Sequence, residues 1–179
     1  MKQWKTHSKE NVMTGNKFLS IEKHKVEAPD GTVINDWQIV VTPDFVNIVA
    51  VTKDGKFLIL KQNKYAVEGD SLAPVGGYIE SGEDPFEAAK RELQEETGYA
   101  SDEWIDMGNY IIDSNRGCGK AFFFLAKNIY KVSEPTEIDM ELPAILFLTK
   151  QEIESAIDRN QFKVLPWVTN ILLALKQLN

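Results

Sequence analysis

The stretch from Gly77 to Tyr99 constrains the fold of this chain more than any other, because it specifies both ends of a helix. Asp84 is suited to cap the helix, Pro85 is suited to its first position, and Glu87 stands where it completes a capping box. Gly98 can end the helix in a left-handed turn. We therefore predict a helix between residues 84 and 98 that follows a glycine-containing loop.

The predicted helix carries an acidic side next to its apolar side. At 100° per residue, Glu92 lies close to Glu95 and Glu96. Like charges at this spacing oppose a helix by about 0.2–0.5 kcal/mol per pair unless a cation lies among them. Oxygen ligands without Cys or His suit Mg²⁺, or alternatively Mn²⁺, better than Zn²⁺. The simpler interpretation is a solvated acidic face, which is common on surface helices.

The complete spacing favours the metal site. Seven positions carry the pattern G-x5-E-x7-R-E-x2-E-E-x-G: Gly77, Glu83, Arg91, Glu92, Glu95, Glu96 and Gly98. At ordinary residue frequencies this pattern occurs by chance on the order of once in a hundred million starting positions. It resembles the Nudix box, the signature of hydrolases that cleave a nucleoside diphosphate linked to another moiety. The one departure is Tyr99, where the family usually carries an aliphatic residue.

The resemblance implies a role for each residue of the box. Three carboxylates and one main-chain carbonyl are the implied metal ligands: Glu92, Glu95, Glu96 and Gly76. Arg91 would orient the acidic face through ion pairs, and Glu83 would support the loop or a further ion.

The base that activates water should come from outside the box, because carboxylates committed to cations are poor proton acceptors. The acidic segment from Ser133 to Pro143 resembles the catalytic loop of one Nudix subgroup. Glu137, Asp139 and Glu141 are in range. We favour Glu141, which is nearest the following strand, with Glu137 next; a solvated loop carboxylate is the alternative.

The resemblance covers residues 15 to 178 and is greatest to the ADP-ribose and nucleotide-sugar pyrophosphatases. In that subgroup the N-terminal strands exchange between two subunits and build the nucleoside pocket at the dimer interface. Trp37 stands where an aromatic residue stacks on the base, and Phe18 is a second candidate. Packing within the hairpin is the alternative for Trp37.

Departures from the subgroup leave the substrate open. Lys64 replaces an arginine, which would exchange a bidentate phosphate contact for a point charge, and Ala73 replaces a glutamate. The segment Ser114-Asn115-Arg116 stands where a proline is common. Arg116 lies in a loop with two glycines and two cations that could contact an anionic ligand or be a plain hairpin tip. ADP-ribose, ADP-glucose and GDP-mannose all remain candidates.

The rest of the chain predicts an α/β fold in two parts. Residues 1–42 form an appendage with an antiparallel hairpin of residues 18–26 and 33–41, which is too small to be stable alone. Residues 43–179 form the hydrolase domain. Its expected strands are residues 45–51, 57–60, 104–112, 121–126 and 144–148, and further helices follow Thr149 and start at Pro166. Helices on each side of a mixed sheet give an α/β/α sandwich, which the resemblance also implies.

Composition excludes several functions. The net charge of −7 and pI of about 4.9 argue against nonspecific binding to nucleic acid or to an anionic membrane. No stretch approaches the ~20 apolar residues of a membrane span, so we expect a cytoplasmic protein. Cys118 is the only cysteine, which excludes an internal disulfide and favours a neutral role for it. His7 and His24 have no partners at ligand spacing and are interpreted as surface residues.

These observations predict a homodimeric Mg²⁺-dependent pyrophosphatase that splits a nucleoside diphosphate sugar into a nucleoside monophosphate and a sugar phosphate. One alternative is a sensor that binds nucleotide sugars on the same fold, which has no need of three acidic ligands. Another is a hydrolase of modified nucleoside triphosphates or capped RNA, which the N-terminal hairpin and the acidic surface disfavour.

Overall fold

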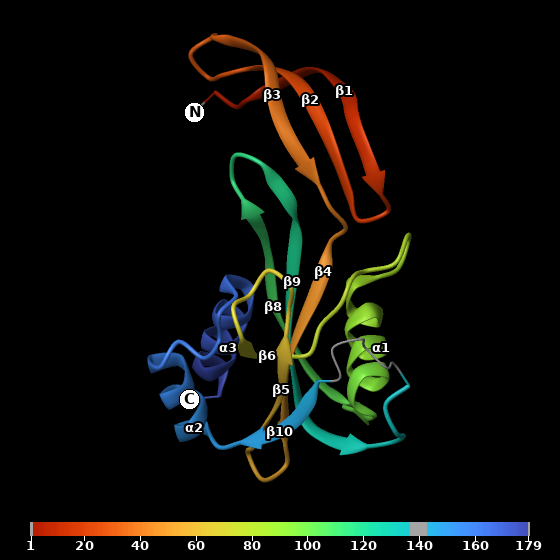
Figure 1. The fold of residues 1–179 in the computed structure, drawn as a ribbon, viewed down its shortest axis with the longest axis vertical. Coiled ribbons are helices and arrows are strands. Elements are labelled where there is room, and N and C mark those ends of the chain that lie inside the picture. The colour runs from red at the N-terminus through yellow and green to blue at the C-terminus, as the bar shows by residue number, and fades with distance from the viewer. Residues whose placement is uncertain (1, 137–142, 179) are drawn as a thin grey trace. The chain divides into compact units, whose positions relative to one another are not determined.

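The structure is a computed structural model that describes residues 2–136 and 143–178. The chain divides into two compact units (Figure 1). The first unit consists of residues 1–44 and 110–120, and the second consists of residues 45–109 and 121–179. Two strands, β8 (Glu103–Asp113) and β9 (Gly117–Lys131), run through both.

The second unit is built on a mixed sheet. Its other strands are β4 (Phe45–Thr52), β5 (Phe57–Asn63), β6 (Asp70–Ala73), β7 (Tyr99–Ala100) and β10 (Ala144–Leu148). In the centre, β4 pairs antiparallel with β5 and parallel with β9. Strands β10 and β6 each pair antiparallel with β5, and β7 pairs antiparallel with β9. The sequence predicted neither β6 nor β7, because both are too short to show an apolar period.

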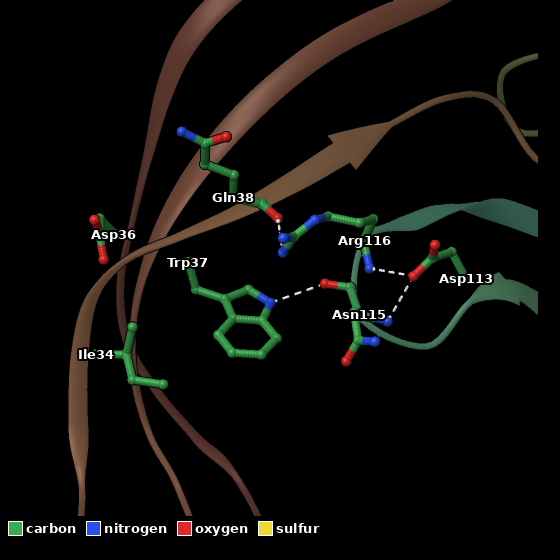
Figure 2. Close-up of a pocket in the computed structure, with 7 residues that line it drawn as sticks. All are labelled: Ile34, Asp36, Trp37, Gln38, Asp113, Asn115 and Arg116. Atoms are coloured by element: carbon green, nitrogen blue, oxygen red, sulfur yellow. Dashed lines mark hydrogen bonds between the residues drawn. The ribbon is translucent and has the colours of Figure 1, made fainter.

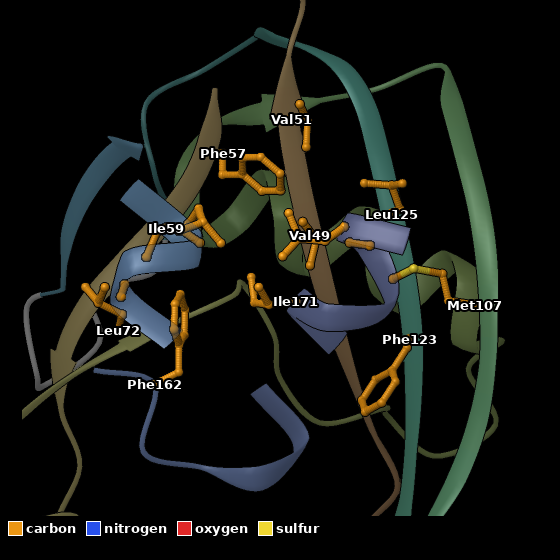
Figure 3. Packing of buried hydrophobic residues seen from close by; sticks show 14 of the residues in the cluster. Val49, Val51, Phe57, Ile59, Leu72, Met107, Phe123, Leu125, Phe162 and Ile171 are labelled. Atoms are coloured by element: carbon orange, nitrogen blue, oxygen red, sulfur yellow. The ribbon is translucent and has the colours of Figure 1, made fainter. Parts of the chain in front are cut away.

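Side chains of the central strands alternate between two apolar layers. Along β4, Ile48 and Ala50 belong to one layer, whereas Val49 and Val51 belong to the other. Helix α1 (Pro85–Thr97) covers the first layer and buries Ala88, Ala89 and Leu93 there. Helices α2 (Lys150–Asp158) and α3 (Leu165–Gln177) cover the second, in which Ile171 packs against β4 and β5 (Figure 3). This arrangement confirms the predicted α/β/α sandwich.

The first unit contains one strand more than the sequence predicted. Its strands β1 (Lys5–Asn16), β2 (Leu19–Glu27) and β3 (Val33–Val41) form an antiparallel sheet. The predicted hairpin of residues 18–26 and 33–41 is present as β2 and β3, but the sequence missed β1, because β1 is exposed at every position and shows no apolar alternation. At the far edge, Val40 of β3 pairs in parallel with Gly117 of β9, and the Val40 N–H donates to the Arg116 carbonyl at 2.8 Å.

Three local predictions also need correction. His24 is buried, not a surface residue, and its Nε2 lies 2.7 Å from Glu22 Oε2, two residues earlier on the same strand. Helix α3 begins at Leu165, one residue before the predicted start at Pro166. The loop predicted before residue 121 is shorter, because β9 begins at Gly117. Among the described residues, every helix is too short or too polar to span a membrane.

Candidate active site

Local sequence sets the limits of helix α1 as predicted. The Asp84 carboxylate accepts hydrogen bonds from the N–H groups of Phe86 at 2.9 Å and Glu87 at 3.3 Å. At the other end, Gly98 adopts φ 73° and donates its N–H to the Gln94 carbonyl at 2.7 Å. The predicted capping box is only half formed, because the Glu87 carboxylate pairs with Lys90 at 2.8 Å.

Arg91 is the centre of the acidic face. It donates to both oxygens of Glu83, from Nε at 2.8 Å and from Nη2 at 2.9 Å. Its Nη1 donates to Glu92 Oε1 at 2.9 Å and to Glu95 Oε2 at 3.0 Å, and its Nη2 donates to the Tyr78 carbonyl at 3.1 Å. One guanidinium therefore holds two glutamates of the helix and one of the preceding loop.

This network determines the charge states of its members. The hydrogen bonds from Arg91, followed by one from the Glu80 N–H, hold the pKa of Glu83 below its ordinary value. The same contacts raise the pKa of Arg91, with Glu83 as the largest cause. Both groups are therefore ionised at neutral pH.

Two glycines let the loop backbone lie directly against the glutamates. A Cβ atom on Gly77 would collide with the Glu92 carboxylate, whose side chain is only 7% exposed. The Gly76 N–H donates to Glu96 Oε2 at 3.1 Å, and a Cβ on Gly76 would collide with Asn47 and the Val46 carbonyl. The loop and the helix thus form one surface on which main-chain and carboxylate oxygens lie together.

A separate pocket of about 580 Å³ lies within the first unit (Figure 2). The Trp37 indole N–H donates to the Asn115 carbonyl at 2.9 Å, and the Arg116 guanidinium carbon lies 5.8 Å from the centroid of the indole ring. Asp113 fixes this turn by accepting the N–H groups of Asn115 and Arg116, each at 2.7 Å. The remaining lining residues are Ile34, Asp36 and Gln38. Trp37 and Arg116, two predicted substrate contacts, are therefore brought together.

The pattern of the Nudix domain family matches residues 42–168 of this chain. The chain belongs to the Nudix family. It is a hydrolase that acts on phosphoric anhydrides. An ADP-ribose pyrophosphatase of Bacillus subtilis (strain 168) is 31% identical over 135 residues, which cover 75% of this chain and 72% of that protein.

Two further comparisons extend the likeness. A methanol dehydrogenase activator of Bacillus methanolicus is 33% identical over 103 residues, which cover 56% of this chain and 55% of that protein. The crystal structure of an ADP compounds hydrolase superposes with a TM-score of 0.83 at 19% identity, covering 99% of this chain and 95% of that one. At that identity the superposition shows a common fold.

The donor atoms of this Nudix hydrolase fit a hard divalent cation. The oxygens of Glu92, Glu95, Glu96 and the Gly76 carbonyl would hold it, and the buried Glu92 charge requires a positive partner. Within residues 2–136 and 143–178, no three His, Cys, Asp or Glu side chains are already arranged as a metal site. Arg91 is the cation that neutralises Glu92 and Glu95 here.

The remaining predicted site residues of the Nudix hydrolase are Phe18, Lys64, Glu137 and Glu141. Phe18 is 42% exposed at the turn between β1 and β2 and is not among the described residues that line the Trp37 pocket. Lys64 follows β5 in the second unit. Glu137 and Glu141 fall outside the described residues. Sequence reasoning missed Asp113. Its carboxylate accepts hydrogen bonds from the N–H groups of the second and third residues that follow it, which is a common turn signal for aspartate.

Proposed function

We propose that this Nudix hydrolase cleaves the pyrophosphate bond of a nucleoside diphosphate sugar, of the ADP-ribose, ADP-glucose or GDP-mannose type, with Mg²⁺ as the working cation. The products would be a nucleoside monophosphate and a sugar phosphate. The observation that carries the proposal is the cluster of Glu83, Glu92 and Glu95 around Arg91, directly beneath a glycine loop. The ADP-ribose pyrophosphatase among the relatives supports this substrate class.

Each residue of the acidic face has a distinct task in this proposal. Glu92, Glu95 and Glu96 bind the divalent ions, while Arg91, itself held by Glu83, keeps the carboxylates oriented. When bound, such ions neutralise the pyrophosphate and orient the attacking water. Glu96→Gln removes one charged ligand with little change in volume, so kcat should fall at least 100-fold while the thermal unfolding curve is retained. An unchanged kcat at saturating Mg²⁺ would show that Glu96 is not a ligand of the catalytic metal.

The proposed general base is Glu141, with Glu137 as the second candidate. Backbone contacts of the described part of the acidic segment support taking the base from this segment, since the Thr136 N–H donates to the Glu95 carbonyl at 2.9 Å. The N–H groups of Val132 and Ser133 also donate to the Gly98 carbonyl, at 2.9 and 3.2 Å. The chain therefore enters this segment directly beside the C-terminal half of α1, which carries the glutamates.

The nucleoside is proposed to bind in the Trp37 pocket, where the indole offers a stacking surface for the base. Arg116 and Lys64 are the proposed cationic contacts to the phosphates. In this scheme residues 1–42 form a nucleoside-binding and dimerisation appendage, and residues 43–179 form the hydrolase domain. Several large apolar side chains exposed in the first unit support a dimer: Trp4, Val12, Met13, Leu19 and Val33. Light scattering that finds a monomer at micromolar concentration would refute the dimer.

The substrate class can be tested with a panel of nucleotide sugars, dinucleotides and nucleoside triphosphates in Mg²⁺, with the products separated by chromatography. We expect a nucleoside monophosphate and a sugar phosphate from at least one nucleotide sugar, and no product from the Glu96→Gln variant. Turnover of triphosphates alone would overturn the substrate class. Tight binding of nucleotide sugars without turnover would instead support the sensor.

A further inference from the structure

A second pocket lies in the second unit, between the start of α1 and strands β8 and β9. Its volume of about 400 Å³ is in the lower range of small-molecule sites. Its walls combine four aromatic rings and one proline with two carboxylates and one amide: Phe86, Trp104, Phe122, Phe124 and Pro85, with Asp84, Asp106 and Asn109. None of these residues has a role in the proposed hydrolysis.

The aromatic wall is a fixed cluster of three rings. The ring centroids of Phe86 and Trp104 are 5.5 Å apart at an interplanar angle of 90°, and those of Phe86 and Phe124 are 5.8 Å apart. Trp104 is held in place because its indole N–H donates to the Ser101 carbonyl at 2.9 Å. The electron-rich faces of such rings attract cations. Lys90 already places its Nζ 4.2 Å from the Phe86 centroid, although Lys90 does not line the pocket.

The two carboxylates of the pocket are not neutralised by a neighbouring cation. Asp84 accepts the N–H groups of Phe86 and Glu87, and Asp106 accepts the Gly108 N–H at 2.7 Å. Within residues 2–136 and 143–178, neither aspartate forms an ion pair with a lysine, arginine or histidine. The pocket therefore presents two uncompensated negative charges beside aromatic surface.

The start of a helix ordinarily favours an anion, but here its donors are already used. Pro85 has no N–H, and those of Phe86 and Glu87 point to the Asp84 side chain. The Ala88 N–H donates to the Asp84 carbonyl at 2.9 Å. With these groups occupied and two aspartates at the rim, a phosphate or carboxylate would meet repulsion without compensating hydrogen bonds.

From these observations we propose that this pocket binds an organic cation through a guanidinium group. A guanidinium stacks on aromatic rings and donates in a planar fork to carboxylates, so it matches both kinds of wall. The proposal is independent of the nucleotide-sugar chemistry, because it rests on residues outside the acidic face of α1.

The test is binding measured by NMR at the indole N–H resonance of Trp104, assigned with a Trp104→Phe variant. Acetyl-arginine amide is the probe, and acetyl-citrulline amide, in which a neutral urea replaces the guanidinium, is its matched control. We expect the arginine probe to shift the resonance with a Kd on the order of 0.1–1 mM, and the citrulline probe to bind at least tenfold more weakly. Acetyl-agmatine, which has the same single charge but lacks the main-chain amide of the arginine probe, identifies the source: tighter binding than the arginine amide indicates a free small molecule, and weaker binding indicates an arginine of a partner protein.

The double variant Asp84→Asn, Asp106→Asn removes both charges while each amide oxygen can still accept the main-chain hydrogen bonds. Helix α1 should therefore remain capped, which thermal unfolding verifies. The arginine probe should bind the double variant at least tenfold more weakly. Three results would each overturn the proposal. The arginine and citrulline probes could bind equally well, or the arginine probe could bind the folded double variant as tightly as the wild type. The third is that the resonance does not shift at probe concentrations on the order of 10 mM.

Discussion

Replacing Arg91 by glutamine should destabilise the protein far more than a single surface charge would. Arg91 makes five hydrogen bonds and is 24% exposed, while its partners Glu92 and Glu83 are 7% and 17% exposed. Breaking a buried ion pair costs about 3–5 kcal/mol, because one charge remains buried without a partner. Since Arg91 is partly exposed, we take the lower end, about 3 kcal/mol. At about 2–4 °C per kcal/mol for a chain of this size, Tm should fall by about 6–12 °C.

The adjacent residue Lys90 provides a matched control. Lys90→Gln removes the same charge from the same helix, but the Lys90–Glu87 pair is largely exposed, with side-chain exposures of 42% and 62%. The cost should be about 0.3 kcal/mol for this pair and about 0.5 kcal/mol for the contact of Lys90 with the Phe86 ring, or about 2–3 °C in all. Arg91→Lys keeps the charge but loses the planar fork to Glu83, so it should fall between the two.

Scanning calorimetry with and without Mg²⁺ completes the test. In Arg91→Gln the glutamates have lost their internal cation, so saturating Mg²⁺ should raise Tm more in this variant than in the wild type. Equal losses of Tm in Arg91→Gln and Lys90→Gln would show that the network does not stabilise the fold. If Mg²⁺ raises Tm equally in the wild type and in Arg91→Gln, Arg91 does not neutralise the carboxylates that bind the metal.

Three other predictions concern the site. The kcat values of Glu141→Gln and Glu137→Gln should be compared at saturating substrate and metal. A fall in kcat of at least tenfold in one variant identifies the base. No fall in either variant shows that this segment does not supply the base. Trp37→Ala should raise KM about 5- to 100-fold with little change in kcat, whereas Trp37→Phe should raise KM much less. Equal KM values for the wild type and both variants would show that the indole does not stack on the base. Because the folded-state pKa of Glu83 is lowered, its contribution to stability is present above its unfolded pKa of about 4.3 and is lost as pH falls through the folded value. The urea midpoint should therefore decline with acid below about pH 4.3, and Glu83→Gln should show a shallower decline over the same range.

The sequence by itself determined helix α1 and the position of its acidic face. Asp84, Pro85 and Gly98 act on backbone groups within a few residues, so the ends of the helix follow from hydrogen bonds that the local chain completes alone. The same holds for α2, which follows Thr149 as predicted and in which Thr149 and Glu152 form a capping box. The continuous apolar runs of β4 and β5 likewise indicated a sheet covered on both faces, because a strand buried on both faces is apolar at nearly every position.

The tertiary structure alone decided the features that join distant parts of the chain. Strand β1 has no apolar face, so only its pairing with β2 makes it a strand. Trp37 and Asn115 are 78 residues apart and meet because the end of β3 pairs beside the start of β9. Gly77 meets the Glu92 carboxylate only because the loop folds back onto the helix, which no pattern in either segment specifies. Such contacts depend on sheet register and packing between elements, which are properties of the whole fold and not of any short segment.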